Sequence, residues 1–237
     1  MENCYVRLKV SGDLACWTRP ESKVERVSYE CMTPSAARNI LDAICWKPEM
    51  RWVVTRILVL KPVRFQAIRR NELQSKIAPG EVGKWMKDPA GSYRPKAAGT
   101  GEGTDATQRN TLALRDVSYI IEAFPHVYQP TAEDTPTKYM AMFNRRVERG
   151  QCFHQPALGC REFACRFELP DNTERPVAET IEIGRMLYDI IFRDGGEGNR
   201  AIFFQAALAD GVLDSHPDRA IPDESTRKEL LACSSKR

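Results

Sequence analysis

The segment 51–63 constrains this chain most, because it is apolar on both of the faces that a strand would have. Hydrophobic side chains occupy odd and even positions alike, at Trp52, Val53, Val54, Ile57, Leu58, Val59 and Leu60. A strand with this pattern is covered on both sides, so it lies in the middle of a sheet. A chain of 237 residues, 42% of them hydrophobic, is long enough to bury the core that such a sheet needs.

Periodicity and helix-ending residues predict the other elements of the first half. Residues 4–10 and 111–122 alternate as strands do, residues 11–33 form a polar loop, and 63–72 continues as a strand or hairpin with Arg69, Arg70, Asn71 and Glu72 at its tip. A helix, capped by Ser35, is predicted from Pro34 to the residue before Pro48. Glycines and prolines break the pattern at 76–109, which predicts a mobile insertion with short helical pieces around Trp85.

The predicted order is strand, helix, strand, strand, and a further strand after the insertion. This order is typical of an α+β fold with an antiparallel sheet, as in ferredoxin-like or RNA-recognition domains. We therefore expect such a domain over residues 1–124.

The second half is predicted to form a smaller β-rich domain over residues 125–213. It begins with a helix that Thr135 caps, with Pro136 at the first helical position. Strands are predicted at 163–169 and 186–192, and a short helix at 202–208. Aspartate, proline, serine, lysine and glutamate dominate from residue 214 to 237, which predicts a flexible tail.

Positive charge is concentrated near the start of the chain. Residues 1–76 hold 14 lysines and arginines against 8 acidic residues, whereas the remainder holds 21 against 24. The imbalance favours a polyanionic partner, although a solvated surface with arginine stems over apolar area explains it as well. Cations for phosphates and aromatic rings for base stacking are what single-stranded RNA requires, so RNA is the leading partner. The candidate RNA-binding residues are Arg19, Lys23, Arg26, Arg38, Trp46, Lys47, Arg69, Arg70, Arg145 and Arg146.

Several classes of protein are disfavoured. The sequence contains no P-loop, no G-x-G-x-x-G and no H-E-x-x-H motif. Cys152, His154, Cys160 and Cys165 lie close in sequence, but their spacing matches no zinc pattern, so neither a metal nor another cofactor is predicted. No apolar run reaches the ~20 residues of a membrane span and no secretory signal is visible, so we expect a cytoplasmic protein.

The helix that begins at Thr135 is the strongest site that the residues alone indicate. Its first-turn amide groups and its dipole favour an anion, and Lys138 adds positive charge in the same turn. The alternative, that Lys138 simply extends into solvent, stays open. On the earlier helix, Cys45 follows Leu41 at the spacing of a packed core cysteine.

A series of ordered motifs resembles one known family. The motifs are CWTRPE at 16–21, KVERVSY at 23–29, PSAAR at 34–38, WKP at 46–48, RRNE at 69–72, FNRR at 143–146, GQCF at 150–153 and LGCREF at 158–163. They resemble the CRISPR-associated RAMP protein of subtype I-C, the fifth Cas family. The match covers most of the chain apart from 76–109 and the tail.

The resemblance implies a ferredoxin-like N-terminal domain, a β-rich C-terminal domain and a metal-independent endoribonuclease that cuts the repeat hairpin of precursor CRISPR RNA. It also implies that the protein retains the 5′ handle as a subunit of the type I-C interference complex. Its partners would then be the backbone and large subunits, with target DNA near the protospacer-adjacent motif as a further candidate. The implied chemistry is attack of a 2′-hydroxyl on the adjacent phosphate, which needs a proton acceptor, a proton donor and a cation.

This sequence departs from the family pattern at two of three catalytic positions. In the family, a tyrosine or histidine precedes Trp-Lys-Pro, and a lysine–histidine pair begins the second-half helix. Here these positions hold Cys45 and the pair Lys138 and Tyr139, so the imidazole that suits proton transfer near neutral pH is missing. Two functions stay open: a nuclease that uses Lys138, Tyr139 and Cys45, and an architectural subunit that holds RNA cut elsewhere. A thiol enzyme based on Cys45 ranks last.

Overall fold

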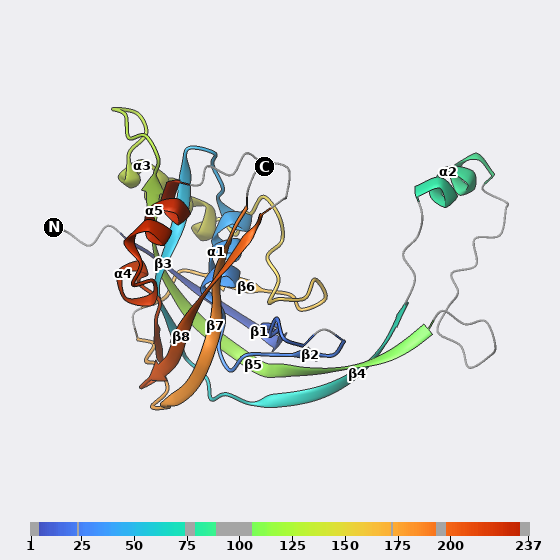
Figure 1. Cartoon of the computed structure of the whole chain (residues 1–237). Helices are drawn as coiled ribbons and strands as arrows, with labels where there is room; N and C mark the ends of the chain where they lie inside the picture. Colours follow the sequence, from blue (N-terminus) through green and yellow to red (C-terminus); the bar gives the residue numbers. More distant parts are fainter. Residues whose placement is uncertain are drawn as a thin grey trace.

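The computed structural model describes residues 5–22, 24–73, 79–88, 106–171, 173–192 and 198–232. Within these ranges nine strands form one curled sheet in the order β6-β1-β5-β3-β9-β8-β7, and β2 and β4 also pair with β5 (Figure 1). The strands are β1 Val6–Ala15, β2 Arg26–Val27, β3 Met50–Val59, β4 Phe65–Leu73, β5 Ala106–Val127, β6 Arg166–Glu168, β7 Ile181–Ile191, β8 Arg200–Ala209 and β9 Val212–Asp214. The helices are α1 Pro34–Ile44, α2 Pro79–Lys87, α3 Pro136–Glu148, α4 Pro217–Ala220 and α5 Glu224–Ala232.

The middle of the sheet is formed by β3 and β5, which confirms that the two-sided apolar segment is a central strand. β3 lies between β5 and β9, and Trp52 and Ile57 are almost completely buried. β5 is longer than its apolar pattern predicts, because it pairs first with β4 and then with β1 and β3. Asp116, within the stretch of β5 that pairs with β1, adopts a φ of 51°, a left-handed conformation that aspartate tolerates better than most residues.

The predicted order of elements in the first half is confirmed, with differences at the ends of α1. Thr33 caps this helix instead of Ser35: its hydroxyl accepts a hydrogen bond from the backbone N–H of Ala36 at 3.2 Å. Pro34 therefore takes the first helical position, which suits its fixed φ. The helix ends at Ile44, and Cys45 has extended backbone. Residues 45–49 thus form a short connection between α1 and β3.

The insertion differs from the prediction at its borders. The helix expected around Trp85 is present as α2, whereas residues 89–105 lie outside the described residues. The segment 69–72 is not a hairpin tip, because it lies inside β4 and pairs with residues 107–110 of β5. The polar loop predicted at 11–33 also contains the end of β1 and the short strand β2.

The second half contains two clear departures from the predictions. Residues 202–208 belong to β8, where burial alternates with a period of two at Ile202, Phe204, Ala206 and Leu208. Periodicity alone does not separate strand from helix in so short an apolar run. Residues 214–232 are not a frayed tail, because they form the end of β9, α4 and α5, and Leu230 is buried.

The sheet continues from the first half of the chain into the second. β9 pairs with β3 over Arg56 to Leu58, and the predicted boundary at residue 124 falls inside β5. The division into two domains therefore stays a prediction. None of the helices in the described ranges combines the length and the hydrophobicity that a bilayer crossing demands.

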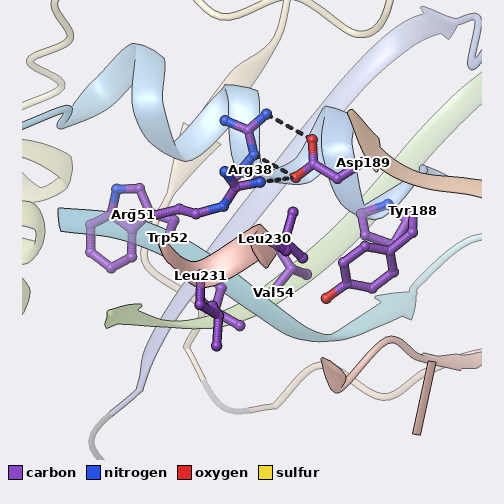
Figure 2. Close-up of a pocket in the computed structure, with 10 residues that line it drawn as sticks. Arg38, Arg51, Trp52, Val54, Tyr188, Asp189, Leu230 and Leu231 are labelled. Atoms are coloured by element: carbon purple, nitrogen blue, oxygen red, sulfur yellow. Dashed lines mark hydrogen bonds and ion pairs between the residues drawn. The ribbon is translucent and has the colours of Figure 1, made fainter. Parts of the chain in front are cut away.

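A buried ion-pair network joins α1, β3 and β7. Asp189 on β7 accepts hydrogen bonds from Arg38 Nε at 2.9 Å, from Arg38 Nη2 at 3.1 Å and from Arg51 Nη2 at 2.5 Å. Figure 2 shows both guanidinium groups directed at this carboxylate, with Leu230 and Leu231 of α5 nearby. Burial would raise the pKa of Asp189, but Arg38 and Arg51 outweigh it and hold the pKa below its usual value.

We expect Asp189→Asn to lower the free energy of unfolding by about 3 kcal/mol at neutral pH, because two buried arginines lose their counter-charge. Since the folded pKa of Asp189 is lowered, its contribution is present at neutral pH and is lost as the pH falls through that lowered pKa. Urea unfolding at several pH values measures both effects.

The matched control for this substitution is Asp13→Asn, which removes a partner from the exposed Arg166–Asp13 ion pair. We expect little change in stability, since exposed pairs contribute little. Equal losses for the two variants would contradict a special role of Asp189.

Candidate functional site

The start of α3 holds the predicted catalytic pair Lys138 and Tyr139. Thr135 caps this helix as predicted, accepting a hydrogen bond from the backbone N–H of Lys138 at 3.2 Å. Asp134, one residue before the cap, accepts hydrogen bonds from Lys138 Nζ at 2.9 Å and from Tyr139 Oη at 2.7 Å. The lysine and the tyrosine are therefore brought together by one carboxylate, which the sequence analysis did not single out.

The protonation states of this cluster follow from its surroundings. Burial of Tyr139, and next its hydrogen bond to Asp134, raise the pKa of the phenol well above its usual value. The hydrogen bonds from Tyr139 and then from Lys138 lower the pKa of Asp134. Near neutral pH the cluster thus consists of an ammonium, a carboxylate and a neutral phenol. It offers a cation and a hydrogen-bond donor, while the phenol is a poor proton acceptor.

Cys45 is a packed core cysteine, as its spacing predicted. It is fully buried, and its carbonyl accepts a hydrogen bond from Trp52 Nε1 at 2.8 Å. Burial raises the pKa of its thiol, although the positive charges of Arg146 and Lys47 oppose this effect. Cys45 in turn contributes to the raised pKa of Tyr139, so the end of α1 and the start of α3 border one region.

The cations near the end of α1 differ in their availability. Arg146 donates to the carbonyl of Ile44 at 2.7 Å and so ties α3 to the end of α1. Lys47 and Arg145 have no carboxylate partner within the described part of the chain, and the ring of Trp46 is 37% exposed. Each of these three side chains is open, fully or in part, to a ligand.

Two of the predicted RNA-binding arginines, Arg26 and Arg70, gather around Glu72 of β4 together with Arg109, which was not predicted. The carboxylate lies 3.5 Å from Arg26, 3.2 Å from Arg70 and 3.6 Å from Arg109, and Arg70 also pairs with Glu162. A phosphate that approaches these arginines must therefore compete with a carboxylate. Arg69, the neighbour of Arg70, is exposed and has no acidic partner among the described residues.

The remaining candidates are placed as follows. Arg19 Nη2 donates hydrogen bonds to both carboxylate oxygens of Glu30, at 3.0 and 2.8 Å. The guanidinium of Arg19 also lies 4.4 Å from the centre of the Tyr29 ring. Lys23 lies outside the described residues. Arg38 was predicted to bind RNA, and this is wrong, because the residue is 7% exposed and is occupied by Asp189 and Asp42.

Cys160 lies in an environment that sequence spacing did not reveal. The neighbouring Cys16 thiol and the Arg26 guanidinium, whose Nη1 lies 3.1 Å from the Cys160 sulfur, hold the pKa of Cys160 below its usual value against the opposing effect of burial. Gly159 has a φ of 87°, and a Cβ there would collide with the Cys16 carbonyl, so this close approach requires glycine. In the described ranges no three cysteine, histidine or acidic side chains gather as metal ligands would.

An open cavity of about 500 Å³ lies between the end of α1 and the loop that follows α3. Its lining residues are Asn39, Asp42, Ala43, Trp46, Phe153 and His154. In the sequence His154 stands out only as a neighbour of Cys152, Cys160 and Cys165. The structure places it instead beside Trp46, which directly follows Cys45.

Known proteins resemble this chain in sequence and in fold. The family model described as CRISPR-associated protein (Cas_Cas5) matches residues 5–227. The CRISPR pre-crRNA endoribonuclease Cas5d of Mannheimia succiniciproducens is 46% identical over 222 residues, which cover 90% of this chain and 95% of that protein. The protein of the same name from Thermus thermophilus is 40% identical over 187 residues, which cover 79% of this chain and 73% of that protein.

Solved structures share the fold. A crystal structure of a CRISPR-associated protein superposes with a TM-score of 0.58 at 21% identity, covering 89% of this chain and 90% of that one. A functionally uncharacterized protein from Streptococcus mutans, SMU1763c, also gives a TM-score of 0.58, at 19% identity over 89% of this chain and 91% of its own.

We expect Tyr139→Phe to raise the pKa of Asp134 toward its usual value, because the phenol donates the hydrogen bond that lowers this pKa most. An NMR titration of the aspartate carboxyl carbons measures the change. Tyr188→Phe removes a hydroxyl that donates to the Ser215 carbonyl and is the control, for which the Asp134 titration should not move. An unchanged Asp134 titration in Tyr139→Phe would show that the cluster is not coupled as described.

Proposed function

Because the chain belongs to the Cas5d family of CRISPR-associated proteins, we propose that it binds the repeat-derived 5′ handle of CRISPR RNA and cleaves precursor CRISPR RNA without a metal ion. The names of the two relatives support this proposal. The observation in this chain that carries it is the exposed Lys138 ammonium, which Asp134 holds beside Tyr139 at the start of α3.

In the proposed reaction a 2′-oxygen of the RNA attacks the adjacent phosphorus atom. The bond between the 2′-oxygen and phosphorus forms, the bond from phosphorus to the 5′-oxygen breaks, and the products end in a 2′,3′-cyclic phosphate and a 5′-hydroxyl. The 2′-hydroxyl loses its proton and the 5′-oxygen gains one. Negative charge grows on the non-bridging oxygens in the transition state, and a fixed cation stabilises it there.

Lys138 is suited to supply that cation. Its ion pair with Asp134 is partly exposed, and such pairs contribute little to the stability of the fold. A phosphate can therefore replace the carboxylate at a small cost in free energy. Tyr139 remains protonated and donates a hydrogen bond, so we assign it a positioning role and not the role of proton acceptor. Neither Tyr139 nor Cys45 is a good proton acceptor at neutral pH, because the pKa of each is raised. We therefore propose that cleavage is slow.

An architectural subunit that binds the handle without cutting it is the second candidate. The burial of Cys45 and the raised pKa values of Cys45 and Tyr139 favour it. A thiol enzyme is disfavoured for the same reason. In either candidate the protein would act as a cytoplasmic subunit of a type I-C interference complex, next to the backbone and large subunits and near target DNA.

Incubation of the protein with labelled precursor RNA in excess EDTA tests the proposal. We expect one cut that leaves a cyclic phosphate, and a loss of about 10²-fold in the cleavage rate for Lys138→Ala. The matched control is Lys228→Ala, since Lys228 also pairs with an acidic residue four positions away, Glu224, but lies on α5. Tight binding of intact RNA would support the architectural subunit, and full activity of Lys138→Ala would contradict the role of this lysine.

We expect Arg145→Ala to weaken the binding of RNA whatever its sequence. The slope of the logarithm of the binding constant against the logarithm of the salt concentration should become shallower by about 0.7 to 1, as the loss of one phosphate contact does. Fluorescence anisotropy at several salt concentrations measures this slope. Arg185→Ala is the control, since this arginine lies over the ring of Phe203 on the β7–β8 side of the sheet. Identical slopes for the wild type and Arg145→Ala would place the RNA backbone elsewhere.

A further inference from the structure

We propose that the cavity between the end of α1 and the loop after α3 is a pocket for one unpaired nucleobase of the bound RNA. The inference rests on the proposed function and adds to it a site at which a base is held. The cavity is open and measures about 500 Å³. It adjoins the segment 45–47 through Trp46, so a base held there lies close to the proposed cleavage region.

The pocket presents aromatic rings that the protein leaves in contact with solvent. Trp46 is 37% exposed and Phe153 is 72% exposed, although they come from separate segments of the chain. His154 packs edge-on against Phe153, with ring centres 4.4 Å apart and the planes 67° from each other. Every nucleobase has a π face, so exposed aromatic rings favour the stacking of an unpaired base.

The walls of the pocket are held in place before any ligand binds. The backbone N–H groups of Phe153 and His154 both donate to the carbonyl of Ala43, at 2.8 and 3.0 Å. Gln155 anchors the other end of this loop by donating to the Cys165 carbonyl at 3.1 Å. A loop whose backbone is already held in place avoids much of the entropic cost of ordering it when a ligand binds.

Polar and charged groups select a nucleotide over a purely apolar ligand. The amide of Asn39 and the imidazole of His154 supply hydrogen-bond donors and acceptors, which match the polar edge of a base. Lys47 directly follows Trp46, and both Lys47 and Arg145 lie close enough to Cys45 to favour its thiolate. Neither side chain lines the pocket, but both cations lie near Cys45, next to Trp46, where they can pair with RNA phosphates; an apolar peptide or a lipid chain would leave them unpaired.

Alanine variants of the two aromatic residues test the pocket. We expect Trp46→Ala and Phe153→Ala each to raise the Kd for repeat RNA by about 5-fold to 100-fold, the range for the loss of one stacked base. Trp46→Phe keeps an aromatic face and should retain most of the affinity. Phe192→Ala removes an exposed ring that does not line the pocket and should bind as the wild type does. Thermal melts confirm that each variant is folded, and Phe153 is too exposed for its loss to disturb the core.

A second measurement identifies the base. Repeat RNAs that each lack a single base are compared on the wild type and on Trp46→Ala. We expect one abasic position to weaken binding to the wild type and to have little further effect on Trp46→Ala. If the wild type binds RNA but neither the alanine variants nor any abasic position changes the Kd, the pocket is refuted while the proposed function stands. If the wild type does not bind repeat RNA, the proposed function fails and the pocket with it.

Discussion

The buried contact of Asp189 with Arg38 and Arg51 is the interaction on which the arrangement of this protein depends. β3 and β7 are separated in the sheet by β9 and β8, yet this contact joins them, because the sheet curls until β7 meets α1. The short strand β9 pairs only with Arg56 to Leu58 of β3, so it does not extend along the start of β3. Leu230 and Leu231 of α5 line the small cavity at that start. A buried ion pair of this kind adds little net stability, but it penalises every arrangement in which one partner is left alone.

The position of α1 decides where the candidate site lies. Its end carries residues 45–47, and Arg146 ties α3 to it through the carbonyl of Ile44. Lys138, Tyr139 and the cavity beside Trp46 are therefore carried by elements that pack on the same core. Several predicted cations already have an acidic partner, as Arg19 has Glu30 and Lys138 has Asp134. Bound RNA would exchange these contacts for phosphate contacts, which makes the affinity sensitive to salt.

The elements that were predicted correctly are those whose signals lie within a few neighbouring residues. The central strand β3 and the cap of α3 at Thr135 depend on patterns within a few residues, and both were predicted. The segment 202–208 was wrongly assigned to a helix. Its apolar run is too short for the period of a helix to be distinguished from the period of a strand. Arg38 was assigned to RNA as one of a set of cations interleaved with aromatic residues, and only its partner on β7, 151 residues away, explains its burial.

The sequence by itself determined the order of the main elements of the first half, the central strand and the motifs that lead to the family. It also determined that Cys45 stands where the resemblance implies a tyrosine or histidine, and Tyr139 where it implies a histidine. Only the tertiary structure decided which cations are free, that Asp134 holds Lys138 and Tyr139, and that the C-terminal segment covers the core as α4 and α5. The physical reason is that strand and cap patterns are local, whereas burial and charge pairing depend on which distant segments meet.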